Sequence, residues 1–216
     1  MSQAVLISIR PKWCSKIANG EKTIEVRKRQ PRLDVPFKVY IYCTHGPDML
    51  WILNQEDRKL FPEKPTDVFT AKDAGGLYPG NGKVIGEFIC DKIYELAPLN
   101  HAPDDVEQMA CLTREEIVQY LRGVGYGWHI SDLKIYDTPK EIHEFWAYNE
   151  ELHKRYDAGV EFCCYDATDE YGDALTDCGD ACNDILNCYR CWGEWNGWCH
   201  RLKRPPQSWC YVEELP

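Results

Sequence analysis

The chain has 216 residues, enough for one hydrophobic core with insertions but too few for two domains of typical size. Its formal charge is -10, with 35 acidic and 25 basic residues, which disfavours broad binding to a phosphate backbone unless the basic residues gather in one place. No stretch approaches the roughly 20 apolar residues of a membrane-spanning helix, and the first apolar run is too short for a signal peptide, so we expect a soluble, cytoplasmic protein with no membrane partner.

Apolar, β-branched and aromatic residues predict four strands in the first half of the chain. They fall at residues 4–10, within 19–31, at 37–43 and at 83–96. A helix is predicted over residues 11–20, because Pro11 suits a first helical turn and Gly20 a C-terminal cap. Gly86 indicates a β-bulge in the fourth strand. Residues 46–82 carry Pro and Gly and are predicted to form a long surface loop.

A second helix is predicted over residues 112–123. Thr113 and Glu116 have the spacing of a capping box, and Gly123 follows the end of the helix. Its predicted buried face consists of Ile117, Tyr120 and Leu121.

The last predicted elements are a strand over residues 126–137, a helix over 138–145 with Thr138 as its N-cap, and a final strand over 208–215. The helix is expected to continue through residues 149–156. Short strands interrupted by two or three helices predict an α+β fold, a small and partly closed β-barrel with flanking helices that fill its gaps.

The segment "NGEKTIEVRKRQP", residues 19–31, contains an unusual strand. Ile24 and Val26 alternate with polar residues, which sends Thr23, Glu25 and Arg27 to the opposite face. A strand face with so many charges is either a solvated edge or a functional site.

Eight of the 12 cysteines fall in the last quarter of the chain, which favours a local metal site over a disulfide framework. Cys188 and Cys191 have the two-residue spacing of a zinc knuckle, and Cys199 lies eight residues further on. The fourth ligand is left open among Cys163, Cys164, Cys178 and Cys182, with His200 less favoured. A structural zinc is expected because residues 158–200 have too few aliphatic side chains for a core of their own. Reduced free thiols and disulfides are the alternatives.

The remaining cysteines of the strand and helix segments are predicted to be small buried hydrophobic residues. They are Cys14, Cys43, Cys90 and Cys111.

Several segments resemble the ASCH-domain proteins, a branch of the PUA-like superfamily. They are "ISIRPKWCSKIANGEKTIEVRKR", "GKVIGEF", "GWHISDLKIYD" and "RPPQSWCYVEEL", in the family's order. The family motif G-x-K-x-x-E-x-R is present as Gly20, Lys22, Glu25 and Arg27. The cysteine-rich piece is similar to that of phage and gut-bacterial members. The resemblance implies an ASCH domain over residues 1–157 and 201–216, a Cys-rich insertion over 158–200, and Cys164 as the fourth zinc ligand.

The resemblance also implies recognition of RNA or a nucleotide in a cleft between barrel and helix. Lys22 and Arg27 would hold a phosphate or carbonyl oxygen, and Glu25 would accept a hydrogen bond from an exocyclic amine or orient Arg27. The alternative is a structural ion pair between Glu25 and Arg27. Trp13 is expected to supply a stacking platform and Lys12 part of a basic rim, although exposed lysines also simply block edge pairing.

His129 is a further candidate that would donate to a base or a phosphate, with a purely structural role as the alternative. Trp128 and Trp209 also lie in matched segments, and either would stack a base if it faced the cleft. Most of the eight tryptophans are nevertheless expected in the core.

Some ASCH relatives hydrolyse N4-acylated cytidine with a lysine, a threonine and a glutamate. Lys22 matches the lysine, but Glu25 stands at the threonine position, and only Thr23 offers a nearby hydroxyl. Three functions therefore remain: a regulatory RNA-, nucleotide- or modified-base-binding protein; a hydrolase of an acylated pyrimidine nucleoside or RNA that uses Lys22 and Glu25; or a protein-interaction factor that uses the zinc insertion.

Overall fold

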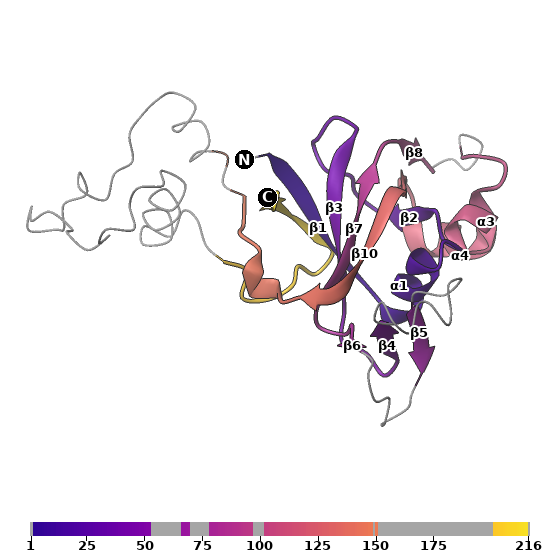
Figure 1. The fold of residues 1–216 in the computed structure, drawn as a ribbon. Coiled ribbons are helices and arrows are strands. Elements are labelled where there is room, and N and C mark those ends of the chain that lie inside the picture. The colour runs from indigo at the N-terminus through magenta and orange to yellow at the C-terminus, as the bar shows by residue number, and fades with distance from the viewer. Residues whose placement is uncertain are drawn as a thin grey trace, which may run out of the picture.

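The structure of the chain is a computed structural model (Figure 1) that describes residues 2–52, 66–69, 78–96, 102–148, 150 and 201–215. The fold is mixed α+β. Among these residues, the strands form a five-stranded sheet and two three-stranded sheets. The predicted partly closed barrel is therefore only partly correct, because the strands of the described residues divide into separate sheets with no closed barrel among them.

The five-stranded sheet has the order β10-β7-β3-β1-β11. Its strands are β1 (Gln3–Ile9), β3 (Phe37–Cys43), β7 (Val84–Cys90), β10 (Ser131–Lys140) and β11 (Trp209–Glu213). β1 and β3 run parallel, and the other neighbours run antiparallel. The chain can return to a parallel strand because α1 (Pro11–Ala18) and β2 (Ile24–Arg27) form the crossover. The last strand, β11, pairs with the first, so both ends of the chain lie together (Figure 1).

The second sheet has the order β2-β9-β8, with β8 at Ile93–Glu95 and β9 at Tyr126–His129. Ile24 and Val26 of β2 pack against the two short helices α3 (Val106–Ala110) and α4 (Arg114–Leu121). Figure 1 shows α1, α3 and α4 grouped beside β2. The predicted alternation is therefore confirmed, and the opposite face of β2 points toward α1 and the first sheet.

The third sheet lies in the segment that was predicted to be a loop. It has the order β5-β4-β6, with β4 at Met49–Ile52, β5 at Thr66–Phe69 and β6 at Tyr78–Pro79. The loop prediction over 46–82 is wrong for these strands. These strands are too short for the two-residue alternation of apolar side chains to be recognised among the surrounding Pro and Gly residues. Leu50 and Ile52 are identified as core residues only by their packing beside α1.

The predicted helix over 138–145 is also wrong. Thr138 is not an N-cap, because β10 continues to Lys140 and only a short 3-10 helix, Ile142–Glu144, follows. The capping box there starts at Glu141 and not at Thr138. The long pairing of β10 with β7 overrides the local helix preference.

Two predictions from glycine positions are confirmed. Gly20 follows α1 with a φ of +74°, and its N–H donates to the Ile17 carbonyl. In β7, the register of the pairing with β3 shifts between Gly86 and Val84, which is the predicted bulge. A Cβ at Gly86 would lie 2.4 Å from the Lys134 carbonyl oxygen, so the close approach of β10 requires glycine.

No helix within the described residues has the length and apolar character needed to cross a bilayer.

Candidate functional site

The charged residues of the G-x-K-x-x-E-x-R motif are buried. Lys22, Glu25 and Arg27 expose only 3%, 7% and 8% of their surface. Lys22 lies just before β2, and the other two lie on the face of that strand that turns away from Ile24 and Val26. Of the two alternatives for this strand face, the solvated edge is wrong.

Glu25 lies between the two cations. Its carboxylate is 3.5 Å from Lys22 Nζ and 3.0 Å from Arg27 Nε. Removal of three charges from water is costly unless they are paired and hydrogen-bonded. Both cations are paired with Glu25, although the buried Arg27 Nε makes no hydrogen bond within the described residues, so the ion pair that was considered as a structural alternative is present within the site itself.

Arg27 also connects three segments of the chain. Its guanidinium donates to the Ser8 carbonyl of β1 at 2.6 Å and to Ser208 Oγ at 3.3 Å. Ser8 in turn donates from its hydroxyl to the Pro206 carbonyl and from its N–H to the Ser208 carbonyl. Arg27 therefore holds β2, β1 and the segment before β11 at one place.

Lys22 donates from Nζ to the Ala110 carbonyl at the end of α3, at 2.8 Å. Burial lowers the pKa of Lys22 below the ordinary lysine value of 10.5, and the nearby carboxylate of Glu25 opposes this shift only in part. Lys22 is thus an ammonium group that deprotonates more readily than an exposed lysine.

The three charged residues line a cavity of about 400 Å³. Its walls come from β1 and the start of α1, from β2, from α4, and from the segment that precedes β11. The other polar groups in these walls belong to Ser8, Arg10, Thr44, Glu116, Tyr120 and Gln207. The cavity therefore combines buried hydrogen-bond donors and a carboxylate with aromatic walls, which suits a small planar polar ligand.

Trp13 lines this cavity, as predicted for a stacking platform. Two ammonium groups lie near its ring: Lys12 Nζ is 4.8 Å and Lys22 Nζ is 5.4 Å from the centroid. Lys12 is exposed and does not itself line the cavity, but it lies over Trp13, which does.

Tyr120 lines the cavity, although its helix periodicity had predicted a core position. Ile117 and Leu121 are buried as expected, but Tyr120 is 45% exposed. Helical spacing alone does not distinguish a core position from a cavity position for Tyr120, because Tyr120 lies three residues after Ile117 and next to Leu121. The tertiary position of α4 across from α1 decides between them. Gln207 was likewise missed, although it lies in one of the segments that resemble the ASCH family.

His129 does not belong to this cavity. Its Nδ1 lies 2.6 Å from Asp91 Oδ1, and its ring meets the Tyr94 ring edge to face. His129 pairs with Ile24 in the sheet, so its side chain lies on the face of Ile24 and not on the face of Glu25 and Arg27. The candidate role of His129 in the same cleft as Lys22 is therefore not supported by the geometry.

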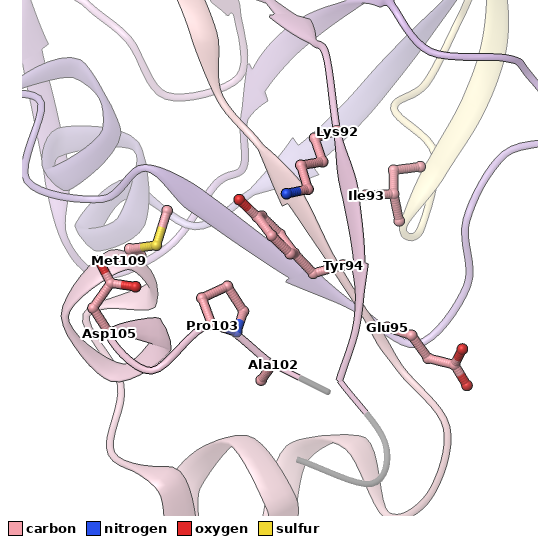
Figure 2. Close-up of a pocket in the computed structure, with 8 residues that line it drawn as sticks. All are labelled: Lys92, Ile93, Tyr94, Glu95, Ala102, Pro103, Asp105 and Met109. Atoms are coloured by element: carbon pink, nitrogen blue, oxygen red, sulfur yellow. The ribbon is translucent and has the colours of Figure 1, made fainter. Parts of the chain in front are cut away.

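A second cavity, of about 760 Å³, lies between β8 and α3 near Tyr94 (Figure 2). Lys92, Tyr94 and Glu95 come from the strand side, while Pro103 and Met109 come from the helix side. Met109 lines this second cavity, and the next residue, Ala110, accepts the hydrogen bond from Lys22. α3 thus lines the larger cavity through Met109 and contacts Lys22 of the smaller cavity through the Ala110 carbonyl, while the motif residues line only the smaller one.

Two other tryptophans of the matched segments lie outside the small cavity. Trp128 is fully buried, and Trp209 packs on it with ring centroids 6.0 Å apart. Trp128 therefore belongs to the core, and the partly buried Trp209 packs against it.

The predicted zinc ligands Cys164, Cys188, Cys191 and Cys199 lie outside the described residues, as does the whole of the predicted insertion with the alternatives Cys163, Cys178, Cys182 and His200. Among the residues that are described, no group of three or more His, Cys, Asp and Glu side chains could hold a metal ion.

The cysteines predicted to be buried hydrophobic residues mostly are. Cys14, Cys43 and Cys90 are buried, while Cys111 is only partly so. Burial raises the pKa of the Cys14 thiol well above its ordinary value, so this group stays protonated behind the cavity.

No protein-family model and no curated protein matches the chain. Solved structures that resemble it include three of an ASCH protein. One is an ASCH protein of Zymomonas mobilis, with 17% identity, a TM-score of 0.42, and coverage of 64% of this chain and 73% of that chain. Two point mutants of that protein match with 16% and 17% identity and TM-scores of 0.42 and 0.39, covering 64% and 63% of this chain and 76% and 70% of theirs. ASCH is also the family that the motif segments resemble, and the phage or gut-bacterial type stays a prediction.

Proposed function

We propose that the small cavity binds one nucleotide or modified base, as part of RNA or free, in a binding protein with a regulatory role. The observation that carries this proposal is the burial of Lys22, Glu25 and Arg27 at a cavity that Trp13 also lines. The buried cations supply donors for a phosphate or carbonyl oxygen, and the indole supplies a stacking surface. A volume of about 400 Å³ is in the range of small-ligand sites and is too small for a duplex.

The burial of the motif decides which variants test the proposal. Alanine at Lys22 or Arg27 would leave Glu25 with only one of its two counter-charges and break contacts to Ala110 or Ser8, so a loss of binding could come from misfolding. Trp13 is the better position, because the Trp13→Leu substitution removes the stacking surface and keeps an apolar side chain.

The test is isothermal titration of the wild-type protein and of Trp13→Leu with ribonucleoside 5′-monophosphates and with N4-acetylcytidine. We expect a loss of about 1 to 3 kcal/mol in binding free energy for the variant. The matched control is Trp209→Leu, which removes a partly buried indole outside the cavity and should leave the affinity unchanged. No binding of any nucleotide by the wild-type protein, or equal losses in both variants, would refute the proposal.

A hydrolase is the second candidate, and the lowered pKa of Lys22 favours it. A buried lysine that deprotonates readily beside a carboxylate is a pattern of proton-transfer sites. In this function, Lys22 and Glu25 would be the catalytic pair acting on an acylated pyrimidine nucleoside or on RNA. The test is turnover of N4-acetylcytidine and of single-stranded RNA, with loss of turnover in the Lys22→Arg variant, which keeps the positive charge. Absence of turnover by the wild-type protein on both substrates removes this candidate.

For the insertion over residues 158–200, we propose a structural zinc held by Cys188, Cys191, Cys199 and Cys164, and a role as a contact surface for a protein partner. The cysteine spacing and the acidic composition support this proposal. Native mass spectrometry should show one zinc in the wild-type protein and none in the Cys188→Ser variant. Cys210→Ser, outside the insertion, is the matched control. A mass that shows disulfides and no zinc would refute the metal site.

A further inference from the structure

Tyr120 is an exposed aromatic residue on a helix whose neighbouring apolar residues are buried. Its helix neighbours Ile117 and Leu121 are in the core, yet Tyr120 is 45% exposed and lines the small cavity. Trp13 lines the same cavity from α1. The cavity therefore has one aromatic side chain from each of two helices, and the ring of Tyr120 is also exposed on the outer surface.

Three cations surround these two rings. Arg10 lines the cavity, Lys12 lies over Trp13 at 4.8 Å, and Lys28 lies over the Tyr120 ring at 5.4 Å. All three are exposed, and none forms an ion pair with another described residue.

Some cations elsewhere in the described chain have a carboxylate partner. Lys16, Lys38 and Lys83, for example, pair with Glu21, Glu214 and Glu141. At the cavity, the nearest carboxylate on α4 is that of Glu116, which accepts a hydrogen bond from the Thr113 N–H in the capping box. Arg10, Lys12 and Lys28 thus form a group of positive charges at the cavity without an ion-pair partner among the described residues, although the whole chain has a formal charge of -10.

We propose that the ligand is a single strand of nucleic acid of at least two nucleotides. This inference rests on the proposed nucleotide-binding function. One base enters the cavity against Trp13, and the neighbouring base stacks on Tyr120 outside it. The phosphates contact Arg10, Lys12 and Lys28. Each lysine leaves the ring on which it now lies, so that a base replaces the ammonium on the ring and the ammonium binds a phosphate.

A duplex does not fit this arrangement. Its bases are stacked on one another and cannot reach rings on two separate helices, whereas an unpaired strand can place successive bases on separate aromatic side chains. A free nucleoside would use Trp13 but would leave Tyr120 and the cations without a ligand.

The experiment compares ligand length. Wild-type protein is titrated with oligouridylates and oligoadenylates of one, two, four and six residues, and with the matching oligodeoxynucleotides. We expect the affinity to rise about tenfold between one and two residues, because the second base adds one stacking contact. Binding of either sugar series supports the inference, and their ratio identifies the sugar.

Tyr120→Ala should reduce the affinity for the dinucleotide more than the affinity for the mononucleotide, so that the gain in affinity between one and two residues is lost. The matched control is Val118→Ala, because Val118 is 54% exposed on the same helix and does not line the cavity. Equal losses in both variants would overturn the inference.

Lys28→Ala should reduce the slope of log affinity against log salt concentration by about 0.7 for the tetranucleotide, as expected for one lost phosphate contact. Lys92→Ala is the control, since Lys92 lies over Tyr94 in the other cavity. Equal affinity for one, two and four residues overturns the inference and leaves the proposed function in place. Absence of binding at every length overturns both.

Discussion

Glu25 is the residue on which the local electrostatics depend, because its carboxylate is the counter-charge of two buried cations. The Glu25→Gln substitution keeps the shape and removes that charge. We expect a loss of about 3 to 5 kcal/mol in the free energy of unfolding, since an uncompensated buried charge is costly.

The measurement for Glu25→Gln is urea denaturation of the wild-type protein and the variant. The matched control is Glu21→Gln, which breaks the exposed pair with Lys16 and should cost less than about 1 kcal/mol. Similar losses in the two variants would show that the buried trio is not held by its charges.

Lys22 should give the stability of the protein a specific pH dependence. Burial lowers the pKa of Lys22 in the folded state below 10.5. Between the two pKa values the unfolded chain binds more protons than the folded one, so the free energy of unfolding rises with pH across this window. Below the window, Lys22 is charged in both states and the burial penalty is fully present.

Lys22→Met removes this titration and serves as the reference. Urea denaturation from pH 7 to 10.5 should show the stability of the wild-type protein increasing relative to that of the variant as the pH approaches 10.5. A constant difference across this range would contradict the lowered pKa.

At the scale of elements, the N-cap of α4 has the motif that the sequence predicted. The Thr113 hydroxyl accepts from the Glu116 N–H, and the Glu116 carboxylate accepts from the Thr113 N–H. Thr138 has the same residue type and was predicted for the same role, but it lies exposed in β10.

Thr113→Ala should therefore reduce the free energy of unfolding by about 1 kcal/mol. Thr138→Ala is the control and should have a smaller effect, because it removes no cap. The measurement is thermal or chemical denaturation of both variants. A larger loss for Thr138→Ala would contradict the strand assignment.

The two threonines show why one helix could be predicted and the other could not. Residues 112–123 combine a cap with an apolar face that meets Ile24 and Val26, so local and tertiary preferences agree. Residues 138–145 have the local pattern of a helix start, but strand pairing with β7 and the burial of Phe145 prevail. A local pattern is decisive only where the tertiary contacts favour the same structure.

At the scale of the whole molecule, Trp146, which precedes the segment that contains the Cys-rich insertion, lies next to Arg201, which follows it. Trp146 and Arg201 form an antiparallel bridge, and the Leu202 N–H donates to the Phe145 carbonyl at 2.8 Å. Phe145, Leu202 and Val212 share one core cluster. The described part of the chain thus closes on itself between Trp146 and Arg201.

Replacing residues 158–199 by a short Gly-Ser linker should consequently leave the melting temperature and the nucleotide affinity nearly unchanged, because loop length has a weak effect on closure entropy. Bound zinc should be lost in the same variant. Circular dichroism and titration provide the measurements, and the comparison is with the full-length protein. Failure of the shortened chain to fold would show that the insertion belongs to the core.

The sequence alone determined the local features of this protein. The alternation of Ile24 and Val26 with Glu25 and Arg27, the helix caps at Gly20 and Thr113, and the bulge at Gly86 are each set by a few neighbouring residues. The three-stranded sheet within 46–82, the course of β10 and the walls of the cavity depend on contacts between distant segments.

Tertiary structure alone brought Gln207 and Tyr120 to the cavity and separated His129 from it. Periodicity assigns a side chain to a face of its own helix or strand, but it does not say what lies opposite that face. Tyr120 lines the site because α4 stands across from α1, and Gln207 does so because Ser8 and Arg27 hold the segment before β11 against β1. The motif could be recognised in the sequence because its charges stand on one short strand, and the rest of the site could not because its residues meet only after the chain has folded.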